Sequence, residues 1–459
     1  MKIHFIGIGG IGISALAQYY LAKGADVSGS DLVSSEITEM LEKKGVKVFI
    51  GQHKTQNILR GMDLVVYSPA VREDNPEFME ARKKNIELFS YPQALGKLSK
   101  DYFIIAISGS HGKSTTSAMI ALIIIKAGFN PTVILGTKLK EFGNSNFRLG
   151  GIPEDGLENS KFKIQNSEFK FLVIEADEYQ ASFLNYWPNI IVLTNIEEEH
   201  LDYFGNLENI FRAFRDFVNH LPESGTLIIN YDDENARKIE ETLSDRDLNI
   251  VPYYLEMEES FAIREILKIP GKHNISNALG ALMVGRALGI ADEVSLGALA
   301  DYNGAWRRFQ IYEIGLGERG FTLVSDYAHH PTEITATFAS VREKWPEKEI
   351  WAVFQPHQYQ RTYYLFDKLV EVFSKSEAKK IIILPIYDVA GREEGEIKQK
   401  VDSLKLAEAI KERVENKEIF YLADFLEAKR FIENNIKGGE VVVIMGAGDV
   451  YDLVKKFST

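Results

Sequence analysis

The sequence predicts an α/β protein built from three domains, and three observations support this prediction. A chain of 459 residues corresponds to about three domains of ordinary size. Short apolar stretches alternate with segments of helical spacing, as in doubly wound sheets. Glycine-rich turns follow two of these stretches. We expect a Rossmann-like domain over 1–100, a central P-loop ATPase-type α/β domain over 101–308, and a C-terminal Rossmann-like α/β domain over 309–459.

The composition excludes several classes of function. Lys and Arg number 53 and Asp and Glu number 66, so the net charge is −13, and no long basic run suggests nucleic-acid binding. The absence of cysteine excludes disulfides, thiolate metal sites and a cysteine nucleophile. The longest apolar runs, Met119–Ile125 and Ile381–Pro385, are too short to span a bilayer. Without a signal peptide at the N-terminus, we expect a cytoplasmic enzyme.

A glycine-rich turn follows the first apolar stretch of the chain. Gly7, Gly9 and Gly12 form the pattern G-x-G-x-x-G, and helical spacing follows over Ile13–Lys23. The next apolar stretch ends at Asp31, about twenty residues beyond the glycines, where dinucleotide-binding domains carry a ribose-binding acid. Taken alone, the pattern indicates a site for a nucleotide or a diphosphate. The other strands expected in this domain are Asp26–Gly29, Lys47–Ile50 and Leu64–Tyr67, the last of which runs into Ser68.

A second glycine-rich turn opens the central domain. It lies between the apolar run Tyr102–Ile107 and a helical pattern over Ser117–Ala127, and it reads Gly109-Ser-His-Gly-Lys-Ser-Thr115. Backbone N–H groups and the positive end of a helix bind anions at such a turn, Lys113 adds charge, and the Ser114 hydroxyl can hold Mg²⁺. The loop is shorter than the common pattern G-x-x-x-x-G-K-[ST]. The alternative interpretation is a glycine turn with an incidental lysine.

Two further expected strands of the central domain, Phe171–Asp177 and Ile190–Ile196, end in polar residues. Ligands bind at the carboxyl ends of parallel strands. Glu175 and His200 are therefore candidate ligands for Mg²⁺, which an ATP site requires. The alternatives are a solvated carboxylate for Glu175 and a structural role for His200. We interpret the other acids of this region as solvated loop charge: Asp177, Glu178, Glu197, Glu198 and Glu199.

A polar segment, Gly151–Glu168, precedes these strands. It includes Asn159-Ser-Lys-Phe-Lys163, which recurs as Asn166-Ser-Glu-Phe-Lys170, and it lacks the apolar spacing of a core element. We expect a surface insertion that takes no part in the chemistry.

The end of the central domain carries amide and guanidinium side chains. Asn274 and Asn277 lie three residues apart at the start of a helix expected to reach Leu288, hence on one helical face. Carboxamides suit the edge of adenine, although asparagine near a helix start also acts as a cap. Of Arg307 and Arg308, we expect one to reach a phosphate and the other to be a surface charge.

The C-terminal domain repeats the pattern of strands that end in polar residues. His329, His330, His357 and Arg361 stand in expected loops after the first two strands, where they would suit a carboxylate or amine substrate. The alternative for the histidines is packing within the loops. The expected strands are Phe321–Ser325, Ile350–Phe354, Lys380–Leu384 and Val441–Met445.

In their order and spacing, these motifs resemble those of the Mur ligases, the ligases of peptidoglycan synthesis. The resemblance covers nearly the whole chain. It is carried by His4-Phe-Ile-Gly-Ile-Gly-Gly-Ile-Gly12, Gly109-Ser-His-Gly-Lys-Ser-Thr-Thr116, Glu175-Ala-Asp-Glu178, Thr194-Asn-Ile196 with His200, His273-Asn274 with Asn277, Arg307-Arg-Phe-Gln310, Asp326-Tyr-Ala-His-His-Pro-Thr-Glu333, Phe354-Gln-Pro-His357 and Met445-Gly-Ala-Gly-Asp449.

The resemblance is closest to the branch that joins L-alanine to UDP-N-acetylmuramate through an acyl phosphate. It implies ATP as co-substrate, Mg²⁺, small-molecule partners only, and a monomer or weak homodimer without membrane insertion. It also implies a role in cell wall biogenesis, and through it in cell shape and cell division.

The resemblance also implies a set of site residues. The sugar nucleotide would contact Gly9, Gly10, Ile11, Gly12, Asp31 and Ser68. ATP would contact Gly109, Ser110, His111, Gly112, Lys113, Ser114, Thr115, Asn274, Asn277, Arg308 and Asp326. Ser114, Glu175 and His200 would hold Mg²⁺, and His357 and Arg361 would face the amino acid. The implied catalytic residues are Lys113, His200, Arg308 and His329.

Three alternatives remain open at this point. Relatives that act on L-alanine usually read His-Arg-Tyr-x-Arg where this chain has His357-Gln-Tyr-Gln-Arg361, so a recycling ligase that attaches a preformed peptide to the same sugar nucleotide is one alternative. An NAD(P)-dependent dehydrogenase would explain the N-terminal glycines but leaves Lys113 and the C-terminal domain without a role. A binding module that uses ATP only as a switch is the third.

Overall fold

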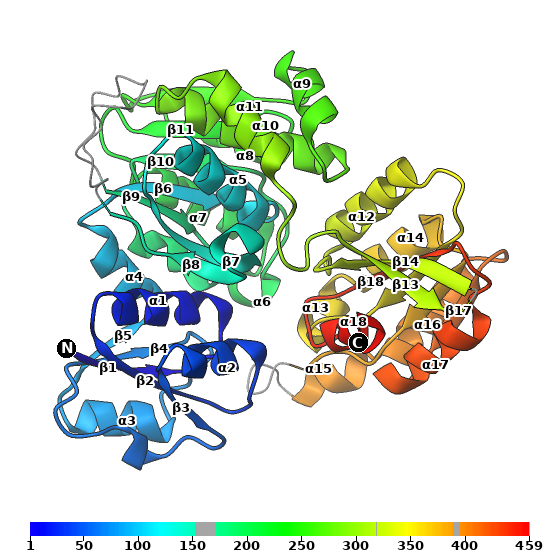
Figure 1. The fold of residues 1–459 in the computed structure, drawn as a ribbon, viewed down its shortest axis with the longest axis horizontal. Helices are drawn as coiled ribbons and strands as arrows, with labels where there is room; N and C mark the ends of the chain where they lie inside the picture. The colour runs from blue at the N-terminus through cyan, green and yellow to red at the C-terminus, as the bar shows by residue number, and fades with distance from the viewer. Residues whose placement is uncertain (152–169, 318, 389–394, 459) are drawn as a thin grey trace. The chain divides into compact units, whose positions relative to one another are not determined.

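The computed structural model describes residues 1–151, 170–317, 319–388 and 395–458 (Figure 1). Its strands form three sheets, of five, seven and six strands, and helices connect them, which confirms the expected α/β class. The chain divides into two compact units, the first of which comprises Met1–Glu199, Asn206–Ile266 and Ser276–Tyr302. The second comprises His200–Gly205, Leu267–Ile275 and Asn303–Thr459. Apart from Gly151, the expected insertion Gly151–Glu168 lies outside the described residues.

The N-terminal sheet is fully parallel, with strand order β3-β2-β1-β4-β5. Apolar side chains of α1 and α2 pack on one face of the sheet, and those of α3 pack on the other. Three helix starts carry side-chain caps, from Ser35, Asn75 and Ser90. The elements are β1 (Lys2–Ile6), α1 (Ile11–Ala22), β2 (Asp26–Asp31), α2 (Glu36–Lys43), β3 (Lys47–Ile50), η1 (Thr55–Asn57), β4 (Leu64–Tyr67), α3 (Pro76–Lys83), β5 (Glu87–Ser90) and α4 (Tyr91–Ser99).

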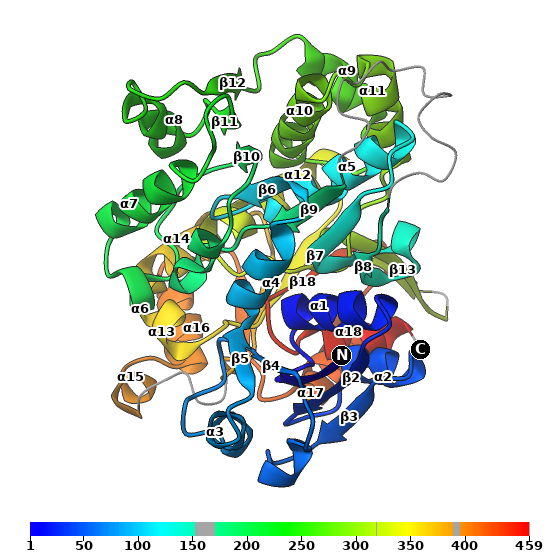
Figure 2. The ribbon, with the colours of Figure 1, turned by 90° about the vertical axis from the view of Figure 1, so that its left-hand side faces the viewer.

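The central sheet has the order β12-β11-β10-β6-β9-β7-β8 and is parallel except for the pair β7 and β8. Within the first unit, α1 packs against β7 and β8, so the two sheets share a helix (Figure 2). The strands are β6 (Phe103–Ser108), β7 (Thr132–Leu139), β8 (Ser145–Arg148), β9 (Phe171–Glu175), β10 (Ile190–Leu193), β11 (Thr226–Asn230) and β12 (Asn249–Tyr253). The helices are α5 (Lys113–Lys126), η2 (Lys140–Phe142), η4 (Tyr179–Asn185), α6 (Leu201–Phe204), α7 (Leu207–Val218), α8 (Glu234–Glu241), α9 (Glu259–Ile266), α10 (Lys272–Ala287) and α11 (Asp292–Asp301).

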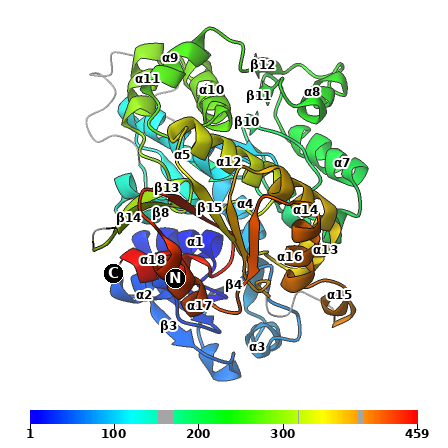
Figure 3. The same cartoon turned by 90° about the vertical axis from the view of Figure 1, so that its right-hand side faces the viewer.

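The C-terminal sheet has the order β13-β14-β18-β15-β16-β17, and only β13 pairs antiparallel in it. Helices α12, α14 and α16 cover one face, and α17 and α18 cover the other (Figure 3). The strands are β13 (Gln310–Leu316), β14 (Arg319–Asp326), β15 (Ile350–Phe354), β16 (Lys380–Ile383), β17 (Glu418–Tyr421) and β18 (Val441–Met445). The helices are α12 (Pro331–Lys344), α13 (Tyr359–Tyr364), α14 (Phe366–Lys375), α15 (Gly395–Lys400), α16 (Ser403–Glu412), α17 (Phe425–Asn435) and α18 (Tyr451–Ser458).

Two local expectations need correction. Arg361 lies in the short helix α13 and not in a loop, because the chain turns helical directly after Gln358. Helix α5 begins at Lys113, four residues before the expected helical pattern, so its first turn is part of the glycine-rich loop. None of the helices in the described part of the chain combines the length and the apolar character needed to cross a bilayer.

Candidate active site

The glycine-rich loop of the central domain is shaped by two glycines that no other residue could replace without strain. Gly109 has φ +139°, and a Cβ there would lie 2.0 Å from Thr194 Oγ1. Gly112 has φ +85°, and a Cβ there would lie 2.4 Å from Asn277 Oδ1. Both backbone conformations lie in the region that favours glycine. The loop therefore approaches the end of β10 and helix α10 closely.

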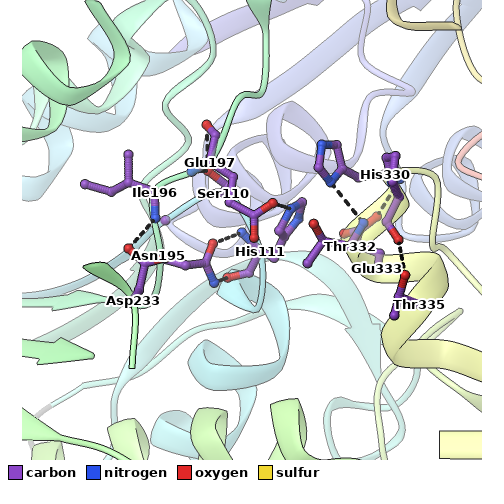
Figure 4. Close-up of polar contacts among 12 residues, drawn as sticks. Ser110, His111, Asn195, Ile196, Glu197, Asp233, His330, Thr332, Glu333 and Thr335 are labelled. Atoms are coloured by element: carbon purple, nitrogen blue, oxygen red, sulfur yellow. Dashed lines mark hydrogen bonds and ion pairs between the residues drawn. The ribbon is translucent and has the colours of Figure 1, made fainter. Parts of the chain in front are cut away.

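Polar side chains after β10 hold the loop in place. Thr194 Oγ1 donates a hydrogen bond of 2.6 Å to the carbonyl of His111. Asn195 Oδ1 accepts one of 2.8 Å from the His111 N–H, and Ser110 Oγ accepts one of 2.8 Å from the Glu197 N–H (Figure 4). These bonds leave the N-terminus of α5 as an array of N–H groups suited to phosphate.

Lys113, the first residue of α5, points back into the loop. Its Nζ donates to the carbonyls of Gly109 at 2.6 Å and Ser110 at 3.2 Å, and it lies 2.8 Å from Glu178 Oε2. Burial lowers the pKa of Lys113, but the charges of Glu178 and Asp177 raise it, and the net result is a rise. Lys113 is therefore positively charged, and its ammonium is held within the glycine-rich loop.

Ser114 and Glu175 form a pair of oxygen ligands beside the loop. The Ser114 hydroxyl donates a 2.9 Å hydrogen bond to Glu175 Oε2, and the N–H of Gly136 donates one of 2.5 Å to Glu175 Oε1. Glu175 is half-buried, and both of its carboxylate oxygens accept hydrogen bonds. A hydroxyl and a carboxylate at this separation are the oxygen ligands that Mg²⁺ prefers.

The interpretation of the neighbouring acids as solvated charge is wrong for two of them. Glu178 is 1% exposed and Glu199 is 6% exposed. Glu178 follows β9 at the start of η4, and its carboxylate contacts Lys113. Asp177 is exposed. Sequence spacing does not reveal this burial, because it depends on the packing of η4 against α4 and α7.

The N-terminal glycines surround the start of α1. The N–H groups of Gly7 and Ile8 donate to the Ser30 carbonyl at 2.8 and 3.0 Å, and the Gly9 N–H donates to Asp31 Oδ2 at 2.8 Å. The expected ribose-binding acid therefore also fixes the glycine turn. A Cβ at Gly12 would lie 3.0 Å from the ring of Tyr91, a neighbour that spacing did not suggest.

Ser68 belongs to the same end of the N-terminal sheet. Its N–H donates to the Ile6 carbonyl at 2.9 Å, and its Cβ lies 3.0 Å from where a Gly7 Cβ would stand. The residues expected to contact the first substrate thus lie together at the carboxyl ends of β1, β2 and β4.

The asparagines of α10 have different surroundings. Asn274 Nδ2 donates a 2.6 Å hydrogen bond to the Pro270 carbonyl, so this side chain braces the loop before α10. Asn277 lies beside Gly112 of the glycine-rich loop. His273, directly before Asn274 in the motif, is exposed.

The two arginines at the end of the central domain also differ. Arg307 is 7% exposed, and its guanidinium donates to the carbonyls of Gly446 at 2.5 Å and Gly448 at 2.9 Å, so the expectation of a surface charge for one of the pair is wrong. Arg308 lies over the Tyr327 ring, with its Nη1 3.9 Å from Glu333 Oε1. Arg308 is therefore the arginine that can still bind an oxyanion.

His329, His357 and Arg361 gather at the carboxyl ends of β14 and β15. The His329 and His357 ring centres are 5.9 Å apart, and Arg361 Nη1 lies 3.0 Å from His357 Nδ1. The ring of Tyr387 stacks on His357 with centres 5.4 Å apart, a contact that the sequence did not suggest. A guanidinium beside two imidazole rings is a set of groups that can bind a small carboxylate.

His330 has a structural role that agrees with the loop-packing alternative. It is 3% exposed, and its Nδ1 accepts a hydrogen bond from the Thr332 N–H at the start of α12 (Figure 4). His200, in the second unit, precedes α6 with φ +54°, a conformation that is uncommon outside glycine. The structure thus gives His200 a constrained backbone, as is frequent at functional sites.

Comparisons with known proteins agree with this domain order. The Mur ligase family catalytic domain matches residues 2–103, the Mur ligase middle domain 107–266, and the Mur ligase glutamate ligase domain 307–448. The UDP-N-acetylmuramate–L-alanine ligase of Acetivibrio thermocellus is 39% identical over 99% of this chain and 95% of its own length. That of Persephonella marina is 37% identical over 99% and 96%.

Solved structures give the same picture at the level of the fold. The UDP-N-acetylmuramate–alanine ligase of Thermotoga maritima superposes with a TM-score of 0.77 at 26% identity, covering 100% of this chain and 98% of that one. A murein peptide ligase of Psychrobacter arcticus superposes with a TM-score of 0.72 at 23% identity, covering 100% and 98%, and shows the fold alone.

Proposed function

The chain belongs to the Mur ligase family, and from this membership we propose that it joins L-alanine to the lactyl carboxylate of UDP-N-acetylmuramate, with ATP as co-substrate. It is thus an amide-bond-forming ligase of peptidoglycan precursor synthesis. The observation that carries the proposal is the likeness to L-alanine ligases over 99% of the chain, together with an intact phosphate loop. We place the reaction in the cytoplasm, where ATP is available.

The reaction needs two steps, because a free carboxylate has no leaving group that an amine could displace. A carboxylate oxygen first attacks the γ-phosphorus of ATP, the bond to ADP breaks, and an acyl phosphate forms. The free amine of L-alanine then attacks the acyl carbon. Phosphate leaves and carries away the proton that the amine loses, so the products are an amide, ADP and phosphate.

We propose that the nucleotide is held by the loop Gly109–Thr115. Lys113 would bind the β- and γ-phosphates, and the N–H groups at the start of α5 would bind their oxygens. Asn274 and Asn277 are proposed for adenine. Arg308, at the end of the central domain, and Asp326 and His329 of the C-terminal domain would complete the nucleotide site. Arg308 and His329 would stabilise the charge that develops on the transferred phosphoryl group.

The donor set beside the loop fits Mg²⁺. Ser114 Oγ and Glu175 Oε2 lie 2.9 Å apart, and Glu175 is oriented by the Gly136 N–H. We propose Ser114, Glu175 and His200 as the ligands, of which Ser114 and Glu175 belong to the first unit and His200 to the second. When bound, Mg²⁺ would neutralise charge on the phosphates.

The sugar nucleotide is proposed to bind at the N-terminal glycine turn. The turn Gly9–Gly12 would bind the diphosphate, with the N–H groups of Ile11 and Gly12 at the start of α1 as donors. Asp31 and Ser68 would provide polar contacts at the neighbouring strand ends. We propose the domain limits 1–100, 101–308 and 309–459, so that this turn, the phosphate loop and the pair His357–Arg361 each lie in a separate domain.

The test is phosphate release with UDP-N-acetylmuramate and ATP against a panel of amino acids and a preformed peptide. We expect L-alanine to support turnover best, and preference for the peptide would instead favour the recycling ligase. Release of phosphate that does not depend on any amine would favour the nucleotide-switch alternative.

A variant links this activity to the loop. Replacing Lys113 by alanine removes the ammonium from the cradle while the helix retains a favourable residue. We expect turnover to fall by about 10³-fold or more, as for other losses of a charge that stabilises phosphoryl transfer. Near-normal turnover in Lys113→Ala would refute the assignment of the loop.

A further inference from the structure

Glu178 is a buried acid that the proposed reaction does not yet use. Its side chain is 1% exposed, and its Oε2 lies 2.8 Å from Lys113 Nζ, which is itself 16% exposed. A carboxylate so deeply buried is costly unless it has an oppositely charged partner. Lys113 is the oppositely charged partner of Glu178, so the function of Glu178 depends on that of Lys113.

The ammonium of Lys113 has three N–H donors, and the described residues provide three acceptors for them. Two are carbonyls of its own loop, from Gly109 at 2.6 Å and Ser110 at 3.2 Å. The third is Glu178 Oε2 at 2.8 Å. A phosphate oxygen can reach this ammonium as a direct partner only by replacing one of the three.

The three acceptors differ in how easily they can be replaced. The loop carbonyls are fixed by the backbone, since the loop is itself held by Thr194 and Asn195. The Glu178 carboxylate is a side-chain group and can turn away without a backbone change. The negative charge of this carboxylate also repels the negative charge of an incoming triphosphate.

We propose that Glu178 is a positioning residue that holds Lys113 at the mouth of the loop and exchanges with the γ-phosphate when nucleotide binds. The inference rests on the proposed function, because it assigns Lys113 to the phosphates. In the absence of nucleotide, the pair keeps the ammonium oriented. In its presence, the phosphate takes the place of the carboxylate on the same N–H group.

The electrostatics of Glu178 support such an exchange. Burial raises its pKa to about 7, even though the Lys113 ammonium counteracts this rise. A carboxyl group with this pKa can take up a proton near neutral pH when its cation moves to the phosphate. The alternative is that the pair merely stabilises the fold.

The two explanations predict different kinetics for Glu178→Gln. If Glu178 competes with phosphate, its removal strengthens nucleotide binding, because repulsion and competition are both lost. Turnover falls, because the ammonium is no longer held in orientation. We expect the Kd for ADP, and for a non-hydrolysable ATP analogue, to decrease by about 3- to 10-fold, and kcat to fall by about 10-fold or more, since buried charged pairs are worth such factors.

The experiment compares the full-length wild type with Glu178→Gln, Glu178→Asp and a control. The control is Glu259→Gln, which removes a surface carboxylate that lies 2.6 Å from Arg286 Nη2 in the same unit. Nucleotide and UDP-N-acetylmuramate dissociation constants are measured by calorimetry, and kcat by phosphate release. Glu178→Asp restores the charge and should recover part of kcat, whereas the control should match the wild type.

Tighter nucleotide binding together with lower kcat in Glu178→Gln, and an unchanged Kd for the sugar nucleotide, would support the proposal. Nucleotide binding that stays the same or weakens would overturn it. If Glu178→Gln does not fold, nucleotide binding by Glu178→Ala, which also removes the carboxylate, decides in the same way. Failure of the proposed function is distinguishable, because it appears as a lack of alanine-dependent phosphate release in the wild type.

Discussion

Asp326 ends strand β14, and its two carboxylate oxygens accept hydrogen bonds of 2.8 Å from the N–H groups of Phe309 and Ala328. Burial raises its pKa from 3.8 to about 6, although the nearby Arg308 guanidinium and the two N–H groups oppose the rise. In the folded protein the neutral form of this carboxyl is therefore favoured more than in the unfolded chain.

This shift predicts a pH dependence of stability. A carboxyl whose folded pKa is raised contributes stability that is fully present below pH 3.8 and is lost as the pH rises through about 6. We expect the melting temperature of the wild type, relative to Asp326→Asn, to fall over this interval and then to level off. Thermal unfolding of both proteins from pH 4 to 8 measures the difference, and a difference that is constant or rises with pH would contradict the assignment.

At the scale of single residues, the sequence predicts chemistry that is local and misses chemistry that depends on distant contacts. Lys113 and Ser114 follow from the turn in which they stand. The burial of Arg307 could not be predicted from its local sequence, because its acceptors Gly446 and Gly448 lie 139 and 141 residues further along the chain. Glu178 was missed for a similar reason, since its partner Lys113 lies 65 residues before it.

At the scale of elements, a glycine flanks each end of helix α5, and the two glycines differ in what surrounds them. Gly112 has φ +85°, and a Cβ there would lie 2.4 Å from Asn277 Oδ1. Gly128, after the other end of α5, has φ +92°, but a Cβ there would meet no atom of the described residues within 4 Å. The two glycines thus share a backbone conformation and differ in surroundings.

Alanine substitutions at these two positions separate strain from loop geometry. Both variants should lose about 1–2 kcal/mol of stability, because a Cβ is unfavourable at positive φ. Only Gly112→Ala should also weaken nucleotide binding, by about 10-fold or more, because the collision with Asn277 displaces the loop. Calorimetric titration with ADP measures this, and equal affinities for the two variants would show that the loop tolerates the Cβ.

The bounds of elements were predictable where an apolar run is continuous. Strands β15 and β18 coincide with the expected ranges Ile350–Phe354 and Val441–Met445, and both are fully buried. The antiparallel strands β8 and β13 were not expected, because their residues are partly exposed or polar, as is typical of loops. Their pairing is determined by a neighbouring strand and not by their own pattern.

At the scale of the whole molecule, the fold class and the succession of domains were predictable, but the strand order was not. The last strand of the chain, β18, lies between β14 and β15 in the C-terminal sheet. Such an insertion is a long-range contact that no local pattern encodes. The grouping of the N-terminal and central sheets in one compact unit is likewise a property of packing, through α1 with β7 and β8.

The proposed roles of residues in the second unit divide between the two chemical steps. Arg308, His329 and His200 are proposed for the phosphoryl transfer, whereas Arg361, beside His357, is proposed for the amino acid. Arg361→Ala should therefore leave the first step, which uses ATP and the sugar nucleotide, within about 3-fold of the wild type. The second step should need a concentration of L-alanine about 30-fold higher or more, because the amino-acid carboxylate loses a charged partner worth about 2 kcal/mol or more.

Two measurements on the same variant decide between the steps. Rapid quenching without L-alanine reports ADP formed in a single turnover, and amide formation against L-alanine concentration reports the second step. Lys375→Ala, which removes an exposed cation paired with Glu371 in the same unit, serves as the control and should change neither. If Arg361→Ala slows both steps equally, Arg361 acts on the phosphoryl transfer itself, and its assignment to the amino acid fails.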